Sequence, residues 1–117
     1  MEKLTHQEED AMLIVWQKGE GTIREYHSLS PQSLPYTTFA SIIRNLERKN
    51  YLAMRRIGAT NLCTPLISRN DYRRRFMSGI IRDYFQNSYR EMVSFFAEEE
   101  KISAEDLKEI IRIIEHR

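Results

Sequence analysis

The residues best suited to chemistry lie close together in one short stretch of the chain. Their spacing places them on a single face if residues 36–49 form a helix. That face carries hydroxyl groups followed by guanidinium groups, from Thr37, Thr38, Ser41, Arg44 and Arg48. Hydroxyl and guanidinium groups bond phosphate oxygens and base edges, and small side chains let a helix approach a surface closely. The composition of this face indicates a helix that enters the major groove of DNA. The alternative is an ordinary amphipathic helix with a solvated face.

The opposite face of this stretch explains why it should be helical. Phe39, Ile42, Ile43 and Leu46 follow the i, i+3, i+4, i+7 spacing of one buried stripe. Pro35 precedes the helix, where its missing N–H has no consequence. At the other end Asn50 can adopt the left-handed conformation that ends a helix.

Two short β-prone runs, residues 51–57 and 61–66, follow the helix around a loop that contains Gly58. This pattern predicts a hairpin. Arg55 and Arg56 would hold phosphates beside it. Thr60 and Asn61 are expected at its tip. A helix followed directly by a basic hairpin is the winged helix-turn-helix arrangement, which binds DNA.

The preceding residues supply the helices that would position this unit. Thr5 with Glu8 forms a capping-box pattern for a first helix that ends near residues 18–19, with Trp16 as a core anchor. Thr22 is suited to cap a short second helix over residues 23–28, where Thr22 and Arg24 are candidate contacts to the DNA backbone. A short extra strand is expected near residues 21–22. We therefore assign residues 1–67 to a winged-helix domain.

The remaining residues, 68–117, read as three further helices, near 71–86, 88–99 and from 103 onward. They carry more apolar surface than so short a region hides by itself, so we expect a helical region that dimerises with a second copy. Packing back onto the winged helix is the alternative. The candidate dimerisation residues are Phe76, Ile80, Ile81, Tyr84, Phe85, Tyr89, Met92, Phe96, Leu107, Ile110, Ile111 and Ile114. The fold class is thus mainly α.

Composition limits the classes of function. The 117 residues are 41% hydrophobic and 30% charged, with a net charge of +1, which suits a globular domain rather than a disordered chain. Residues 68–90 hold six arginines and two aspartates, net +4, whereas residues 91–117 hold four basic and eight acidic side chains, net −4. The near-neutral total argues against indiscriminate polyanion binding and leaves room for local basic patches.

No run approaches the roughly 20 apolar residues that span a bilayer, and the polar start lacks a signal-peptide core. The single Cys63 cannot form an internal disulfide, which suits a reducing compartment. We expect a cytoplasmic protein without membrane insertion.

The sequence lacks the motifs typical of catalytic, metal-binding and phosphate-binding sites. The three histidines have no His or Cys at ligand spacing, and the four glycines form no phosphate-binding loop. Cys63 lies on the expected hairpin with no His nearby in sequence, so we interpret it as a packing residue. We therefore expect neither an enzyme nor a bound metal or cofactor.

The chain resembles the BlaI/MecI penicillinase-repressor family over nearly its whole length. The resemblance rests on four stretches, Leu4-Thr5 with Glu8-Glu9, the runs at residues 12–16 and 19–25, Tyr36-Thr37-Thr38-Phe39 with residues 42–49, and Pro65-Leu66-Ile67-Ser68. It implies a homodimeric transcriptional repressor that binds palindromic operators with TACA/TGTA-like half-sites. It also implies release through a membrane-bound zinc-protease sensor, which triggers cleavage in the dimerisation region.

Three departures from the family pattern concern mechanism. Asn50 stands where the family usually has Gly, a mild change. The cleavage bond, typically Asn-Phe, aligns with Phe95-Phe96, which lacks the Asn. The C-terminal cysteine cluster of the copper-responsive branch is absent, which disfavours copper sensing. The rival hypothesis is a winged-helix protein-interaction module that no longer binds DNA, but the polar and basic outer face of residues 36–49 argues against it.

Overall fold

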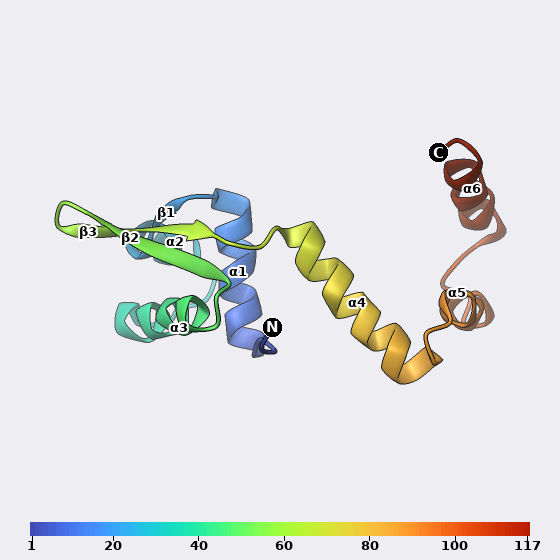
Figure 1. The fold of residues 1–117 in the computed structure, drawn as a ribbon, viewed down its shortest axis with the longest axis horizontal. Helices are drawn as coiled ribbons and strands as arrows, with labels where there is room; N and C mark the ends of the chain where they lie inside the picture. Colours follow the sequence, from blue (N-terminus) through green and yellow to red (C-terminus); the bar gives the residue numbers. More distant parts are fainter. The chain divides into compact units, whose positions relative to one another are not determined.

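The computed structural model describes residues 1–117, and the chain forms two compact units, Met1–Tyr72 and Arg73–Arg117. The first unit contains three helices and a small sheet. Its elements are α1 (His6–Lys18), β1 (Gly21–Thr22), α2 (Ile23–Leu29), α3 (Tyr36–Arg48), β2 (Leu52–Ile57) and β3 (Thr60–Pro65). The hairpin of β2 and β3 projects beyond these helices (Figure 1). This order confirms the predicted winged-helix fold, including the short strand near residue 21.

The sheet is antiparallel with the strand order β1-β3-β2. β1 pairs with β3 through Gly21 and Cys63, so the segment before α2 is tied to the hairpin. In β2 and β3, Leu52 lies opposite Pro65 and Ile57 opposite Thr60. The turn therefore consists of Gly58 and Ala59, and the positive φ of +60° at Gly58 suits the first position of a type II′ turn.

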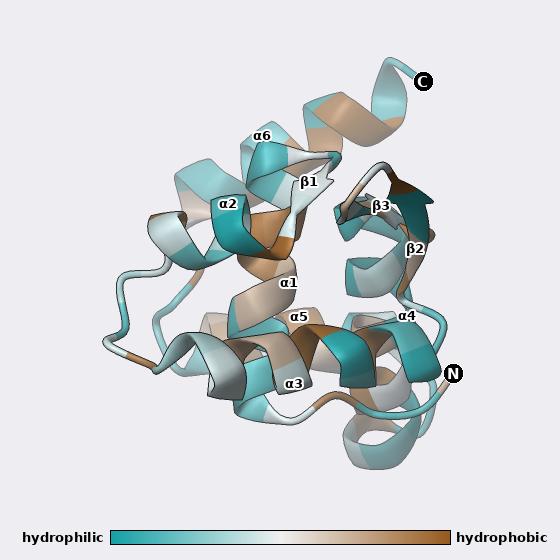
Figure 2. Cartoon of the chain, turned by 90° about the vertical axis from the view of Figure 1, so that its left-hand side faces the viewer, coloured by the Kyte–Doolittle hydropathy of each residue, from teal (hydrophilic) through white to brown (hydrophobic).

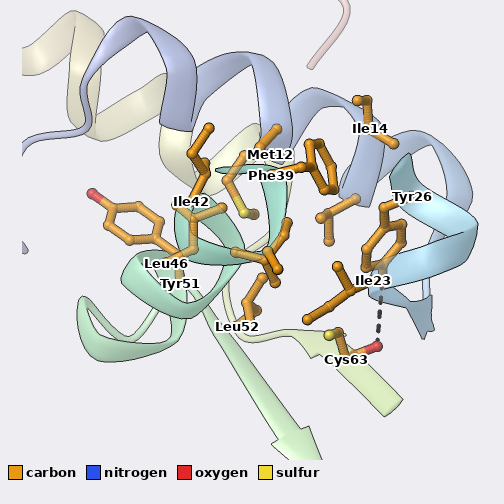
Figure 3. Close-up of a cluster of buried hydrophobic side chains, with 14 of the residues drawn as sticks. Met12, Ile14, Ile23, Tyr26, Phe39, Ile42, Leu46, Tyr51, Leu52 and Cys63 are labelled. Carbon is orange, nitrogen blue, oxygen red and sulfur yellow. Dashed lines mark hydrogen bonds between the residues drawn. The ribbon is translucent and has the colours of Figure 1, made fainter. Parts of the chain in front are cut away.

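The core lies between the three helices and the base of the hairpin (Figure 3). Its largest fully buried side chains in this unit are Met12, Val15, Tyr26, Phe39, Ile43, Leu46, Leu52 and Cys63. The Tyr26 hydroxyl donates to the Gly19 carbonyl at 2.7 Å and lies 3.3 Å from the Cys63 carbonyl, so it joins α2 to β3. Burial raises the pKa of the Cys63 thiol to about 11, as expected for a packing residue.

Trp16 lies half-buried against the core and holds the segment that follows β3. Its indole N–H donates to the Ile67 carbonyl at 2.9 Å, and its ring centroid lies 5.3 Å from that of Tyr72. These contacts fix the chain that leaves β3 against α1.

The predicted caps are present. Thr5 and Thr22 form complete capping boxes with Glu8 and Glu25 at the starts of α1 and α2. Asn50 has a φ of +67°, which ends α3 as the sequence indicated.

The second unit contains most of α4 (Arg69–Phe85), together with α5 (Tyr89–Glu98) and α6 (Ala104–Glu115). Among α4, α5 and α6 only Ile81 is buried. The large apolar side chains left exposed include Phe76, Tyr84, Tyr89, Phe95, Phe96, Ile110, Ile111, Ile113 and Ile114. A single copy of these helices therefore leaves much apolar surface in water. None of the helices has the length and apolar character needed to cross a membrane.

Candidate nucleic-acid interface

The outer face of α3 is polar and open to solvent. Phe39, Ile42, Ile43 and Leu46 are buried, so the remaining side of the helix is presented outward. That side carries the exposed residues Thr37, Thr38, Ser41, Arg44 and Arg48. In Figure 2, where α3 runs across the front, hydrophilic and hydrophobic segments alternate along it. The five predicted residues thus share one exposed helical face.

The start of α3 is also open. Every other helix has a Thr or Ser side chain that accepts a backbone N–H of its first turn, from Thr5, Thr22, Ser68, Ser88 or Ser103. Pro35 precedes α3 and provides no side-chain acceptor. No side chain therefore caps the N–H groups in the first turn of α3. A helix N-terminus of this kind attracts a phosphate.

Arg24 and Tyr36 come together at this same end of α3. The Arg24 guanidinium carbon lies 5.6 Å from the centroid of the Tyr36 ring, and both side chains are exposed. The His27 ring packs edge-on against Tyr36 and also contacts Phe39, while its Nε2 lies 2.7 Å from the Leu34 carbonyl. Sequence reasoning selected Arg24 but missed Tyr36. Its place beside Thr37, as a large exposed aromatic at a helix start, was the available signal.

The side chain of Thr22 is engaged within the protein, whereas the sequence suggested a free contact to the DNA backbone. Its hydroxyl oxygen accepts the Glu25 N–H at 3.1 Å, and its own N–H donates to the Glu25 carboxylate at 2.9 Å. The side chain is half-buried. Capping α2 is thus the role that the structure gives Thr22, with only its hydroxyl hydrogen left for another partner.

The hairpin separates the two predicted arginines. Arg56 pairs with Asn61 across the strands, and this pair continues the sheet face on which Met54 and Cys63 pack toward the core. Arg55 pairs with Leu62 and projects from the opposite face, since successive side chains alternate. The hairpin tip is formed by the turn residues 58–59. Thr60 adjoins that turn and Asn61 lies one step behind it, so the expectation that Asn61 forms the tip needs correction.

Most basic side chains of this surface lack acidic partners. Arg44, Arg55 and Arg56 are exposed and make no ion pair in the structure. Arg48 is the exception, with its Nη1 at 3.6 Å from a Glu2 carboxylate oxygen and its Nε–H donating to Asn45 Oδ1 at 3.3 Å. The surface therefore offers several cations that a polyanion could bind without displacing a carboxylate.

Asn45 is exposed on α3, but its side-chain amide is engaged within the protein. Its amide nitrogen donates to a Glu8 carboxylate oxygen at 3.2 Å, toward α1. The helical period of residues 36–49 cannot show that α1 offers a buried acceptor beside Asn45.

Comparison with known families agrees with this geometry. A family model described as penicillinase repressor matches residues 4–116, which is nearly the whole chain. Comparison with curated proteins gave no significant match.

Proposed function

Since the chain belongs to the penicillinase repressor family, whose members are DNA-binding transcriptional repressors, we propose that it acts as a homodimer on a palindromic operator. Each protomer reads one half-site with α3, because two-fold symmetry in the protein calls for a matching symmetry in the DNA.

The observation that carries this proposal is the character of the α3 surface. It combines small hydroxyl side chains, unpaired arginine and an uncapped N-terminus on one exposed face. Thr37, Thr38 and Ser41 contact base edges or thymine methyl groups near the start of the helix. Arg44 bonds a base or a phosphate, and Arg48 bonds the phosphate backbone farther along.

The remaining contacts bind the DNA backbone on either side of the major groove. Arg55 and Arg56 bind phosphates beside the hairpin, with Thr60 and Asn61 near its end. Arg24 and Thr22 bind phosphate at the start of α2. Such contacts fix the position of the protein without reading sequence.

Dimerisation uses the apolar side chains of the second unit. The exposed Phe76, Tyr84, Tyr89, Ile110 and Ile114 would be covered by the same helices of a second copy. Their exposure in a single chain supports this, because monomeric proteins rarely leave large contiguous apolar patches in water.

Release of the operator occurs by proteolysis in the same region, at or near the Phe95–Phe96 bond, under a membrane metalloprotease sensor. Both rings are exposed, but the bond lies within α5 and the Phe95 ring packs 5.7 Å from Phe85. A protease needs an extended backbone, so α5 must open locally before cleavage. Incubating the chain with its sensor protease and weighing the fragments by mass spectrometry tests this; an intact α5 after release would contradict it.

The operator itself is tested by fluorescence anisotropy with a labelled TACA/TGTA palindrome and a scrambled duplex at physiological salt. We expect two chains per duplex and at least about a thousandfold preference for the palindrome. Thr37→Ala and Thr38→Ala should lower that preference roughly tenfold each, since one lost base contact costs about 1–3 kcal/mol. Ser94→Ala removes an exposed hydroxyl from α5 and serves as the matched control. Equal affinity for both duplexes, together with no enriched site in a selection from random DNA, would reject the proposal.

A further inference from the structure

The carboxyl group of Glu8 is buried, with the side chain only 3% exposed. Its Oε1 accepts the Thr5 N–H at 2.8 Å and the Lys49 ammonium at 2.7 Å. Its Oε2 accepts the Asn45 amide at 3.2 Å. A residue of α1 therefore holds two residues from the C-terminal end of α3.

Lys49 keeps this carboxyl group ionised. Burial alone would raise the pKa of Glu8, but the hydrogen bonds from Lys49 and Thr5 outweigh it and hold the pKa below its ordinary value. The Lys49 ammonium also donates to the Lys3 carbonyl at 3.0 Å, and its side chain is 8% exposed. Lys49 is thus committed to the interior, although its charge and position suggest a DNA contact.

The charge on Glu8 determines which way the Asn45 amide faces. A carboxylate only accepts hydrogen bonds, so Asn45 must turn its NH2 group toward it. The amide oxygen then faces the other way, where it accepts the Arg48 Nε–H at 3.3 Å. With Nε engaged, the terminal nitrogens of Arg48 remain at the surface, where the side chain is 60% exposed.

We infer that Glu8 is a positioning residue for DNA recognition, which acts through Asn45 to orient the Arg48 guanidinium on the face of α3. Glu8 does not touch DNA. The inference rests on the proposed function, because it explains what holds Arg48, one of the arginines proposed to bind the operator, in place.

The substitution Glu8→Gln tests this relay from Glu8 through Asn45 to Arg48, and it changes the shape of the side chain little. A glutamine can still accept the Thr5 N–H, but it can also turn its own NH2 group toward Asn45. Asn45 is then free to flip, and a flipped amide presents a donor to Arg48, which also donates. We expect Glu8→Gln to weaken operator binding about tenfold.

A double-mutant cycle separates positioning from general destabilisation. If Glu8 acts through Arg48, Glu8→Gln causes no further loss of affinity in an Arg48→Ala background. The matched control is Asp106→Asn, which alters the equivalent capping-box acid of α6 and should leave the affinity unchanged. Equal losses from Glu8→Gln in the wild-type and Arg48→Ala backgrounds, or no loss at all, would overturn the inference.

A measurement without DNA keeps the inference separate from the proposed function. The bond to Asn45 should protect the Arg48 Nε–H from solvent exchange in the free protein. Its ¹⁵N NMR signal should be visible in the wild type and lost in Glu8→Gln. Asn45→Ala, at an exposed position, provides the same test if Glu8→Gln does not fold. A signal that survives removal of Asn45 would overturn the relay, whereas an intact relay in a chain that ignores every operator would reject only the proposed function.

Discussion

The guanidinium group of Arg24 lies over the ring of Tyr36, 5.6 Å from its centroid, and so connects α2 to the first residue of α3. A cation above an aromatic face is attracted by the ring quadrupole. The contact holds Arg24 beside the uncapped start of α3, where it and the free N–H groups can bind the same stretch of DNA backbone.

Removing the Tyr36 ring should therefore weaken DNA binding, although no charged group is lost. We expect Tyr36→Ala to lower operator affinity about two- to fivefold, since a cation–π contact at an exposed site contributes about 0.5–1 kcal/mol. Tyr36→Phe keeps the ring and should bind nearly as well as the wild type. Anisotropy titrations of both variants check this. If the phenylalanine variant lost as much affinity as the alanine variant, the hydroxyl rather than the ring would be responsible.

The sequence predicted those parts of the interface that depend on local spacing. The 3.6-residue period separated Phe39 and Ile43 from Thr38 and Ser41, and the confirmed cap at Thr5 depends on a residue three positions away. These patterns are local, so a helix displays them wherever it packs.

The missed features depend on tertiary packing. Nothing near Asn45 in sequence shows that Glu8, 37 residues earlier, supplies a buried acceptor. Likewise the contact between Arg24 and Tyr36 follows from the angle between α2 and α3. The opposite directions of Arg55 and Arg56 were available from strand alternation, but which arginine shares the sheet face that packs on the core depends on the tertiary contacts of Met54 and Cys63.

The two hairpin arginines should consequently differ in their effects. Arg56→Ala should weaken binding to all sequences and reduce the slope of log affinity against log salt by about 0.9, the value for one phosphate contact. Arg55→Ala should do the same to a smaller extent, because Arg55 projects from the other face of the sheet. Salt titrations of each variant against operator and scrambled duplexes measure both slopes. Arg117→Ala, at the exposed end of the chain, controls for the loss of one charge. A slope for Arg56→Ala equal to that of this control would remove Arg56 from the interface.

Dimerisation should depend on the apolar face of α6. Ile110 and Ile114 lie one helical turn apart, with exposed fractions of 42% and 56%. The double variant Ile110→Asp/Ile114→Asp should weaken self-association at least about a hundredfold, since burial of each isoleucine contributes about 1.5–3 kcal/mol. Sedimentation equilibrium measures the change. Lys108→Asp alters the charge of the same helix by the same amount at an exposed position and should remain dimeric. Equal association of the two variants would indicate that charge, rather than apolar contact, controls assembly.

The buried pair of Glu8 and Lys49 predicts a pH dependence of folding stability. The pKa of Glu8 is lowered in the folded protein from its ordinary value of 4.5, so its carboxylate stabilises the fold above that value. This contribution is lost as the pH falls below 4.5 through the folded-state pKa. Glu8→Gln leaves Lys49 buried without a counterion and should reduce the free energy of unfolding by about 3–5 kcal/mol at neutral pH. As acid protonates Glu8, the wild type comes to resemble the variant, so the difference between them should shrink. Urea unfolding of both proteins from pH 7 down to pH 3 tests this, and a difference that stays constant over that range would show that charge at Glu8 does not hold α1 to the end of α3.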